Sequence, residues 1–190
     1  MKNNKVWAFI KPIIVLTLIA AIMAGLLGGT NLLTTEKIKT LEAEAEKSAV
    51  EKVIKAETYN KFEIKLNDVK YTYFKAQNGD ETVGYAFTLS ANGYGGAVKC
   101  VVGIDKSSKI TAVEITDVSN ETRGLGQNAG RVSFTDQFKG KASELSVVKS
   151  GAKENEVQAV TGATITSKAV TKSVNLAMEL YKKIEGEVGK

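Results

Sequence analysis

A chain of 190 residues has room for one globular domain and a short additional segment. Its hydrophobic share of 43% and charged share of 25% are typical of globular proteins. Lys2, Lys5 and Lys11, which precede the first acidic residue Glu36, supply +3 of the formal net charge of +5. The remainder is nearly balanced and has no Arg-rich cluster, so the composition argues against a nucleic-acid partner.

The sequence contains no histidine and a single cysteine. It therefore lacks the commonest general base and the imidazole metal ligand, and one thiol forms neither an internal disulfide nor a thiolate cluster. Cys100 lies in the strand-like run AVKCVVGID and is predicted to be a buried structural thiol. We predict no catalytic residue and no metal site, and any redox chemistry must come from a cofactor.

The N-terminal part reads as a membrane anchor. Residues 1–11 are basic, and residues 12–33 contain no charged side chain. As a helix this apolar stretch spans about 33 Å, enough to cross a hydrocarbon layer of about 30 Å. Basic residues favour the cytoplasmic side, so everything after Leu33 is predicted to be extracytoplasmic. A cleavable signal peptide is the alternative, but such a segment has a shorter apolar region and a cleavage site of the A-x-A type.

The middle of the chain changes from helical to strand-like patterns. Residues 34–60 are predicted to form an amphipathic helix, because apolar residues recur at three- and four-residue intervals. Four runs rich in Val, Ile, Thr, Tyr and Phe then alternate with turn signals, and the short connections favour antiparallel pairing. The runs are VKYTYFKA (69–76), TVGYAFTLS (82–90), AVKCVVGID (97–105) and KITAVEITDVS (109–119).

A last amphipathic helix is predicted from Ser167 to about Gly186. Helices that flank an antiparallel sheet predict the α+β class. We therefore expect a single N-terminal transmembrane helix followed by an extracytoplasmic antiparallel-sheet domain with flanking helices.

The segment TGATITS (161–167) crowds four hydroxyl side chains around a Gly-Ala pair, directly before the last predicted helix. A helix N-terminus favours phosphate, and Thr or Ser there donates hydrogen bonds, caps the helix or becomes esterified. Gly162 and Ala163 offer little steric obstruction to a phosphate or to a second protein acting on this segment. An ordinary capped helix start is the alternative explanation.

Two glycine-rich loops accompany this segment. GYGGAVKC (93–100) feeds directly into a strand, and its glycines suit the close approach of a flat ligand, although a tight hairpin explains them equally well. ETRGLG (121–126) follows a strand but lacks the glycine order of a dinucleotide fold and the G-K-[ST] of a P-loop. An enzyme that uses a soluble nucleotide is therefore disfavoured.

Together these segments resemble the covalent-FMN domain family of bacterial respiratory complexes, and most closely the G subunits of the Rnf ion-translocating ferredoxin:NAD oxidoreductases. GYGGAVKCVVGID is similar to the family's glycine-rich segment before a strand, and ETRGLG to its E-T-P-G-L-G loop. DQFKGK (136–141) resembles a further signature, and TGATITS resembles the flavinylation motif [ST]-G-A-T-x-[ST]. Two departures are Arg123, where the family usually has proline, and Gln158, where an acidic residue often precedes the motif.

The resemblance implies that residues 61–190 form a covalent FMN-binding domain and that Thr166 carries FMN through a phosphoester, attached by a separate flavin transferase. It implies an electron-transfer subunit of a membrane-bound complex that couples ferredoxin oxidation and NAD reduction to Na⁺ or H⁺ transport, with other membrane subunits as partners. The chain would be an electron carrier and not a stand-alone catalyst. The cofactor-binding residues expected on this basis are Thr166, Gly162, Ala163, Thr164, Glu121, Thr122, Leu125 and Gly95.

Three alternatives stay open at this point. The C subunit of sodium-translocating NADH:quinone oxidoreductase shares the motif and the topology, but it is typically longer. A free-standing extracytoplasmic flavoprotein that reduces a small acceptor would use the same cofactor. A membrane-tethered binding or structural module would have no redox centre, and its TGATITS segment would serve only to cap the helix.

Overall fold

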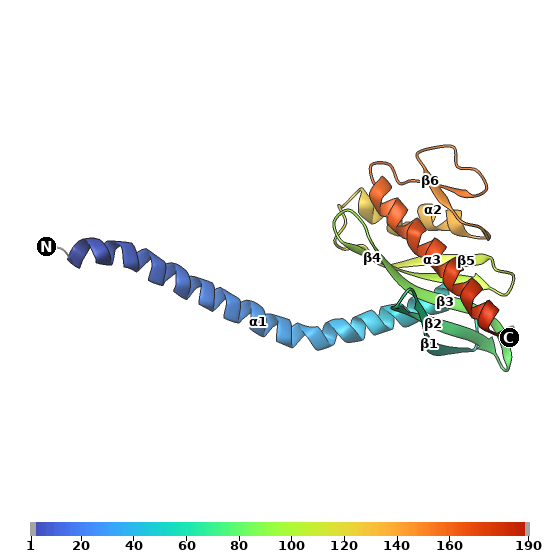
Figure 1. Ribbon diagram of the computed structural model, residues 1–190, viewed down its shortest axis with the longest axis horizontal. Helices are drawn as coiled ribbons and strands as arrows, with labels where there is room; N and C mark the ends of the chain where they lie inside the picture. The colour runs from blue at the N-terminus through green and yellow to red at the C-terminus, as the bar shows by residue number, and fades with distance from the viewer. Residues whose placement is uncertain (1–2, 189–190) are drawn as a thin grey trace. The chain divides into compact units, whose positions relative to one another are not determined.

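The computed structural model describes residues 3–188 and consists of a long N-terminal helix, a five-stranded sheet and a C-terminal helix (Figure 1). Residues up to Glu44 form one unit, and residues from Ala45 onward form a second, compact unit. The elements in chain order are α1 (Asn3–Val53), β1 (Thr58–Leu66), β2 (Val69–Asn78), β3 (Glu81–Asn92), β4 (Ala97–Asp105), β5 (Ile110–Asp117), η1 (Gly126–Gly130), α2 (Val132–Thr135), η2 (Asp136–Phe138), β6 (Ser146–Val148), β7 (Glu156–Gln158) and α3 (Thr164–Val188).

The N-terminal helix is continuous over both segments that the sequence divided at residue 34. Within the described residues, Trp7–Val53 is long and apolar enough to cross a membrane, with a mean hydropathy of 2.4 in its most apolar window, none of which is buried. The predicted basic N-terminus includes Met1 and Lys2, which lie outside the described residues.

The prediction of a helix up to residue 60 was wrong at its end, because α1 stops at Val53 and residues from Thr58 belong to β1. The Tyr59 hydroxyl donates to the Ile54 carbonyl (2.9 Å) and accepts from the Ala56 N–H (2.9 Å). These bonds take up backbone groups that an uninterrupted helix would pair internally. Only the last turns of the helix are covered: Ala49 and Val53 are buried, whereas Leu41 is half exposed.

The five strands pair in sequence order, each antiparallel to the next, as the short connections predicted. The four predicted runs form β2 to β5. The edge strand β1 was not predicted, and it pairs with β2 over its whole length, from Thr58 opposite Gln77 to Leu66 opposite Val69. The domain is therefore α+β, as expected.

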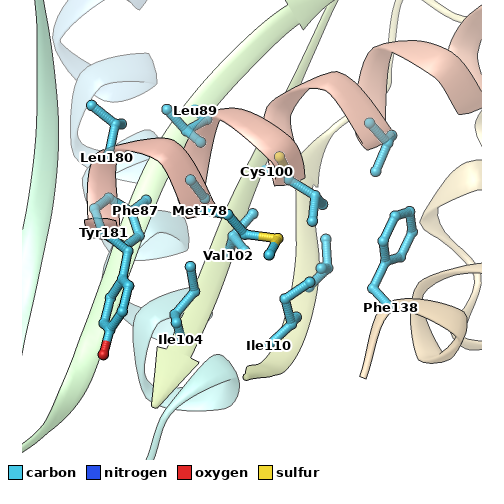
Figure 2. Close-up of a cluster of buried hydrophobic side chains, with 14 of the residues drawn as sticks. Phe87, Leu89, Cys100, Val102, Ile104, Ile110, Phe138, Met178, Leu180 and Tyr181 are labelled. Carbon is cyan, nitrogen blue, oxygen red and sulfur yellow. The ribbon is translucent and has the colours of Figure 1, made fainter. Parts of the chain in front are cut away.

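Helices cover the sheet on both faces, which explains why β3 and β4 are buried on both sides. On one face Val50, near the end of α1, and Ile54, just after it, pack against Ala86 and Val101. On the other face α3 crosses the strands (Figure 1). Figure 2 shows the core between them, in which the labelled side chains of β3, β4 and β5 face those of α3 and η2.

Cys100 belongs to this core and is fully buried, as predicted (Figure 2). Burial raises the pKa of its thiol to about 12. A thiol with such a pKa stays protonated and unreactive at neutral pH.

The segment between β5 and α3 is hydrogen-bonded to the start of the edge strand β5. In the DQFKGK motif, Phe138 is fully buried, and the Gly140 N–H donates to the Ile110 carbonyl (2.7 Å). The Ile110 N–H in turn donates to the Lys141 carbonyl (2.9 Å). Gly140 has a φ of +78°, a value that glycine adopts without strain. This motif therefore fastens the segment to β5. The short strands β6 and β7, which the sequence did not predict, form a parallel pair.

Candidate functional site

Three segments that are far apart in the sequence meet around a cavity of about 510 Å³ at the start of α3. One is the turn between β3 and β4, one is the loop after β5, and one is the beginning of α3 itself. The lining residues are Tyr94, Glu121, Thr122, Leu125, Gly126, Gly162, Ala163, Thr164, Ile165 and Thr166.

A hydrogen bond between Thr166 and Glu121 lies at the centre of the site. The Thr166 hydroxyl donates to Oε2 of Glu121 at 2.6 Å. Both side chains are almost fully buried, with exposed fractions of 1% for Thr166 and 4% for Glu121. A short bond from a hydroxyl to an ionised carboxylate is among the stronger hydrogen bonds in proteins.

The second carboxylate oxygen of Glu121 is held by backbone donors. The Gly95 N–H donates to Oε1 at 3.0 Å. Burial raises the pKa of Glu121, but the hydrogen bonds from the Thr166 hydroxyl and from the N–H groups of Gly95, Tyr94 and Gly96 outweigh it, so the pKa lies below its ordinary value. Glu121 is therefore ionised at neutral pH, although it is buried.

The glycines of GYGG and ETRGLG make room for this carboxylate. A Cβ placed on Gly93 would lie 2.3 Å from Oε1 of Glu121, and a Cβ on Gly126 would lie 2.3 Å from Oε2. A Cβ on Gly95 would lie 2.0 Å from the carbonyl oxygen of Asn120. At these positions the missing Cβ makes room for the loop that carries Glu121, and the approach of a flat ligand to the GYGG backbone stays a prediction.

The last helix begins at Thr164, earlier than the predicted start at Ser167, so Thr166 lies in its first turn. The first N–H groups of such a helix have no helical carbonyl to bond and attract anions. Ser167, one residue further along, is bonded on both sides: its hydroxyl accepts from the Val160 N–H (3.0 Å) and donates to the Ala163 carbonyl (2.9 Å). Ser167 is fully buried and does not line the cavity, and these bonds occupy its hydroxyl, whereas Thr166 is one of the lining residues.

Gly162 is the residue of the motif whose backbone requires glycine. Its φ is +75°, and a Cβ there would lie 2.9 Å from Cδ2 of Leu125. Gly162 thus turns the chain into α3 and at the same time lets the ETRGLG loop approach.

Seven of the eight predicted site residues line the cavity, and Gly95 does not, although its N–H holds Glu121. Sequence reasoning missed Tyr94, Gly126 and Ile165, which lie inside or beside motifs that it had singled out. Of the two departures, Arg123 is exposed and outside the lining, and the Gln158 N–H donates to Oε1 of Gln137 at 2.8 Å.

The rim of the cavity is apolar and open. Tyr94 is 74% exposed, Ile165 53% and Leu125 43%, so each presents apolar surface to solvent beside the cavity. A flat aromatic ring gains by covering such surface, while the helix N-terminus and the hydroxyl groups deeper in the cavity suit a phosphate. The volume lies in the range of small-molecule sites, which is about 300–1,000 Å³. These residues therefore fit FMN.

The state of Glu121 makes the stability of the unmodified domain depend on pH. A carboxylate whose folded-state pKa is lowered stabilises the fold above its ordinary pKa of 4.5, and this contribution is lost as the pH falls through the folded value. We expect the free energy of unfolding to fall more steeply below pH 4.5 in the native chain than in Glu121→Gln, as measured by denaturant titration at a series of pH values. An equal fall of the free energy of unfolding in both chains would show that Glu121 contributes nothing to this pH dependence.

Comparisons with known proteins identify the family of this domain. Residues 93–179, which contain all three segments of the cavity, match the model of the FMN-binding domain family. The chain therefore carries an FMN-binding domain. It is 45% identical over 118 residues to the G subunit of the proton-translocating ferredoxin:NAD(+) oxidoreductase complex of Clostridium ljungdahlii, and this alignment spans 60% of the chain but only 63% of that relative.

A second relative aligns over nearly the full length. The G subunit of the ion-translocating oxidoreductase complex of Photorhabdus laumondii is 31% identical over 180 residues, which are 85% of this chain and 84% of that protein. The chain belongs to the family of G subunits of ion-translocating oxidoreductase complexes. The crystal structure of Shewanella oneidensis NqrC shares the fold, with a TM-score of 0.51 and 20% identity over 66% of this chain and 65% of that one.

Proposed function

We propose that this chain is the G subunit of an Rnf-type complex and that it carries FMN on Thr166 through a phosphoester. The observation that supports the attachment site is the position of Thr166, which lines the cavity from the first turn of α3 and whose hydroxyl bonds Glu121 at 2.6 Å. The neighbouring hydroxyl of Ser167 is hydrogen-bonded to backbone groups on both sides and is the poorer acceptor.

The chain's own residues would bind and orient the cofactor. The N–H groups at the start of α3 would stabilise the charge of a phosphodiester, and Thr164 adds a further hydroxyl at the cavity wall. Tyr94, Leu125 and Ile165 would cover the flavin ring and exclude water from one side of it. FMN supplies one-electron transfer when it is bound, so the protein needs no acid–base side chain for that step.

The subunit would relay electrons within a membrane complex that couples ferredoxin oxidation and NAD reduction to ion transport. This assignment comes from the names of the relatives, which are subunits of ferredoxin:NAD or ion-translocating oxidoreductase complexes. The match to the FMN-binding domain disfavours a module without a redox centre. Membership in a family of complex subunits disfavours a free-standing reductase.

The apolar helix would anchor the chain, with Lys5 and Lys11 on the cytoplasmic side and the FMN-binding domain outside. Covalent attachment has a physical reason in that setting, because FMN that dissociates outside the cytoplasm is lost by dilution. A flavin transferase in the same compartment would attach it.

Production of the full chain together with a flavin transferase tests this function. We expect yellow fluorescence that stays with the band on a denaturing gel and a protein that stays in the membrane after alkaline extraction. We also expect the other membrane subunits to co-purify in mild detergent. A colourless band from cells in which the transferase modifies a known target would contradict the proposal.

A further inference from the structure

We infer that Glu121 is the proton acceptor when Thr166 becomes esterified, so that the chain supplies the base for its own modification. This inference rests on the proposed function, because it assumes that Thr166 receives FMN. The Glu121 carboxylate already accepts the hydroxyl proton of Thr166 at 2.6 Å, within the distance that proton transfer requires.

An alcohol is a weak nucleophile until a base takes its proton. Histidine, the usual base, is absent from this sequence. Of the residues that line the cavity, only Glu121 carries a carboxylate, and its Oε2 accepts the hydrogen bond of the reacting hydroxyl directly. The acceptor chain therefore holds the base in place before a transferase arrives.

The surroundings of Glu121 fix it for this role. Oε1 is held by the Gly95 N–H, and Gly93 and Gly126 approach so closely that a Cβ on either would collide with one of the two carboxylate oxygens. Thr166 is fixed in turn by the first turn of α3. Two loops and a helix start thus converge on one hydroxyl–carboxylate pair.

The step balances with FAD as the co-reactant, presented by the transferase. The bond between Oγ1 of Thr166 and the phosphorus of the FMN half forms, and the bond between that phosphorus and the bridging oxygen of the pyrophosphate breaks. AMP leaves with the electron pair, and the hydroxyl proton moves to Oε2 of Glu121. Nothing is oxidised or reduced.

The test compares the rate of FMN attachment in the full chain and in Glu121→Gln, which keeps the size of the side chain and removes its basicity. Both are made in cells that lack a transferase, purified in detergent, and mixed with FAD and a purified transferase. We expect attachment to slow by about a hundredfold or more, since positioned bases contribute about 10²–10⁴-fold. Glu154→Gln, which changes an exposed carboxylate, is the matched control and should react at the native rate.

The pH dependence separates a base from a merely structural residue. The other ionisable side chain in the lining is Tyr94, Arg123 is exposed in the same loop, and Lys168 is exposed on α3 beyond Thr166. Because both chains meet the same transferase, the ratio of their rates cancels its titration. As the pH rises, hydroxide replaces the missing base in Glu121→Gln. We therefore expect the ratio of the native rate to the Glu121→Gln rate to fall by about tenfold for each unit of increase in pH. A slower reaction with a constant ratio would indicate a structural role and overturn the inference.

The remaining outcomes are also distinguishable. Failure of the native chain to gain FMN would contradict the proposed function itself. Equal rates for the native chain and Glu121→Gln would overturn only the role of Glu121. If Glu121→Gln does not fold, as judged by its thermal unfolding, Glu121→Asp replaces it: the shorter carboxylate should slow attachment and keep the native pH profile. A changed profile with that variant would overturn the inference.

Discussion

Replacing Thr166 by alanine is expected to abolish covalent flavin completely while leaving the chain folded and in the membrane. The alanine removes the oxygen that forms the ester, and the adjacent hydroxyl, that of Ser167, is buried and bonded on both sides. The measurement is flavin fluorescence per unit protein on a denaturing gel, after production with a transferase.

Two controls sharpen the Thr166→Ala result. Thr161→Ala removes an exposed hydroxyl of the same motif and should keep the flavin. Thr166→Ser keeps a hydroxyl at the same position and should also be modified. Full fluorescence in Thr166→Ala, with native circular dichroism, would show that another residue carries the cofactor.

Replacing Phe138 by alanine is expected to lower the free energy of unfolding by about 3–5 kcal/mol, the typical cost of truncating a fully buried phenylalanine. Phe138 is 0% exposed and packs edge-on against Phe134, with ring centroids 5.5 Å apart. Since domains are stable by only about 5–15 kcal/mol, this change removes a large share of the total. The free energy of unfolding of the domain is measured by near-UV circular dichroism during denaturant titration. Tryptophan fluorescence is unsuitable, because the single tryptophan, Trp7, lies in α1 and does not report on the sheet.

Phe62→Ala is the matched control for Phe138→Ala. Phe62 is 45% exposed on the edge strand and stacks on Tyr73 with ring centroids 5.6 Å apart. Its loss should cost about 1 kcal/mol, the scale of an aromatic pair. Similar losses in both variants would contradict the assignment of DQFKGK as a structural motif.

The fold was largely predictable because most of its strands have clear local patterns. β2 to β5 are rich in β-branched and aromatic residues and are separated by short turns, so their antiparallel order follows from connection length. The start of β1 was missed because the apolar residues Val53 and Ala56 continue the helical spacing beyond the end of α1. The hydrogen bonds of the Tyr59 hydroxyl to the backbone of residues 54 and 56, which accompany the end of the helix, leave no such pattern. The strand character of β1 depends on pairing with β2, a tertiary contact that no local pattern records.

The candidate site was predicted by motif and not by geometry. The resemblance singled out all three segments, and the structure brings them around one cavity. No pattern in the sequence indicates that Glu121 and Thr166, which are 45 residues apart, share a hydrogen bond, or that Gly93 and Gly126 are small because a carboxylate lies beside them. Such close approaches depend on side-chain placement across three elements, and residue spacing within one element does not encode them.

The Thr166–Glu121 pair also implies a change on modification. An esterified Thr166 no longer donates a hydrogen bond, so Glu121 loses the strongest of the interactions that lower its pKa and gains an anionic neighbour. The carboxyl group is then expected to hold its proton more tightly in the modified protein than in the unmodified one.

The most direct test of the attachment site is peptide mass spectrometry of the full chain isolated from membranes in which a flavin transferase is active. Tryptic cleavage after Lys153 and Lys168 isolates one peptide that contains the whole TGATITS segment, and fragmentation distinguishes its four hydroxyl residues. We expect this peptide to carry the mass of FMN less one water, with the added mass on Thr166. An unmodified peptide, or FMN on any other residue, would contradict the proposed site.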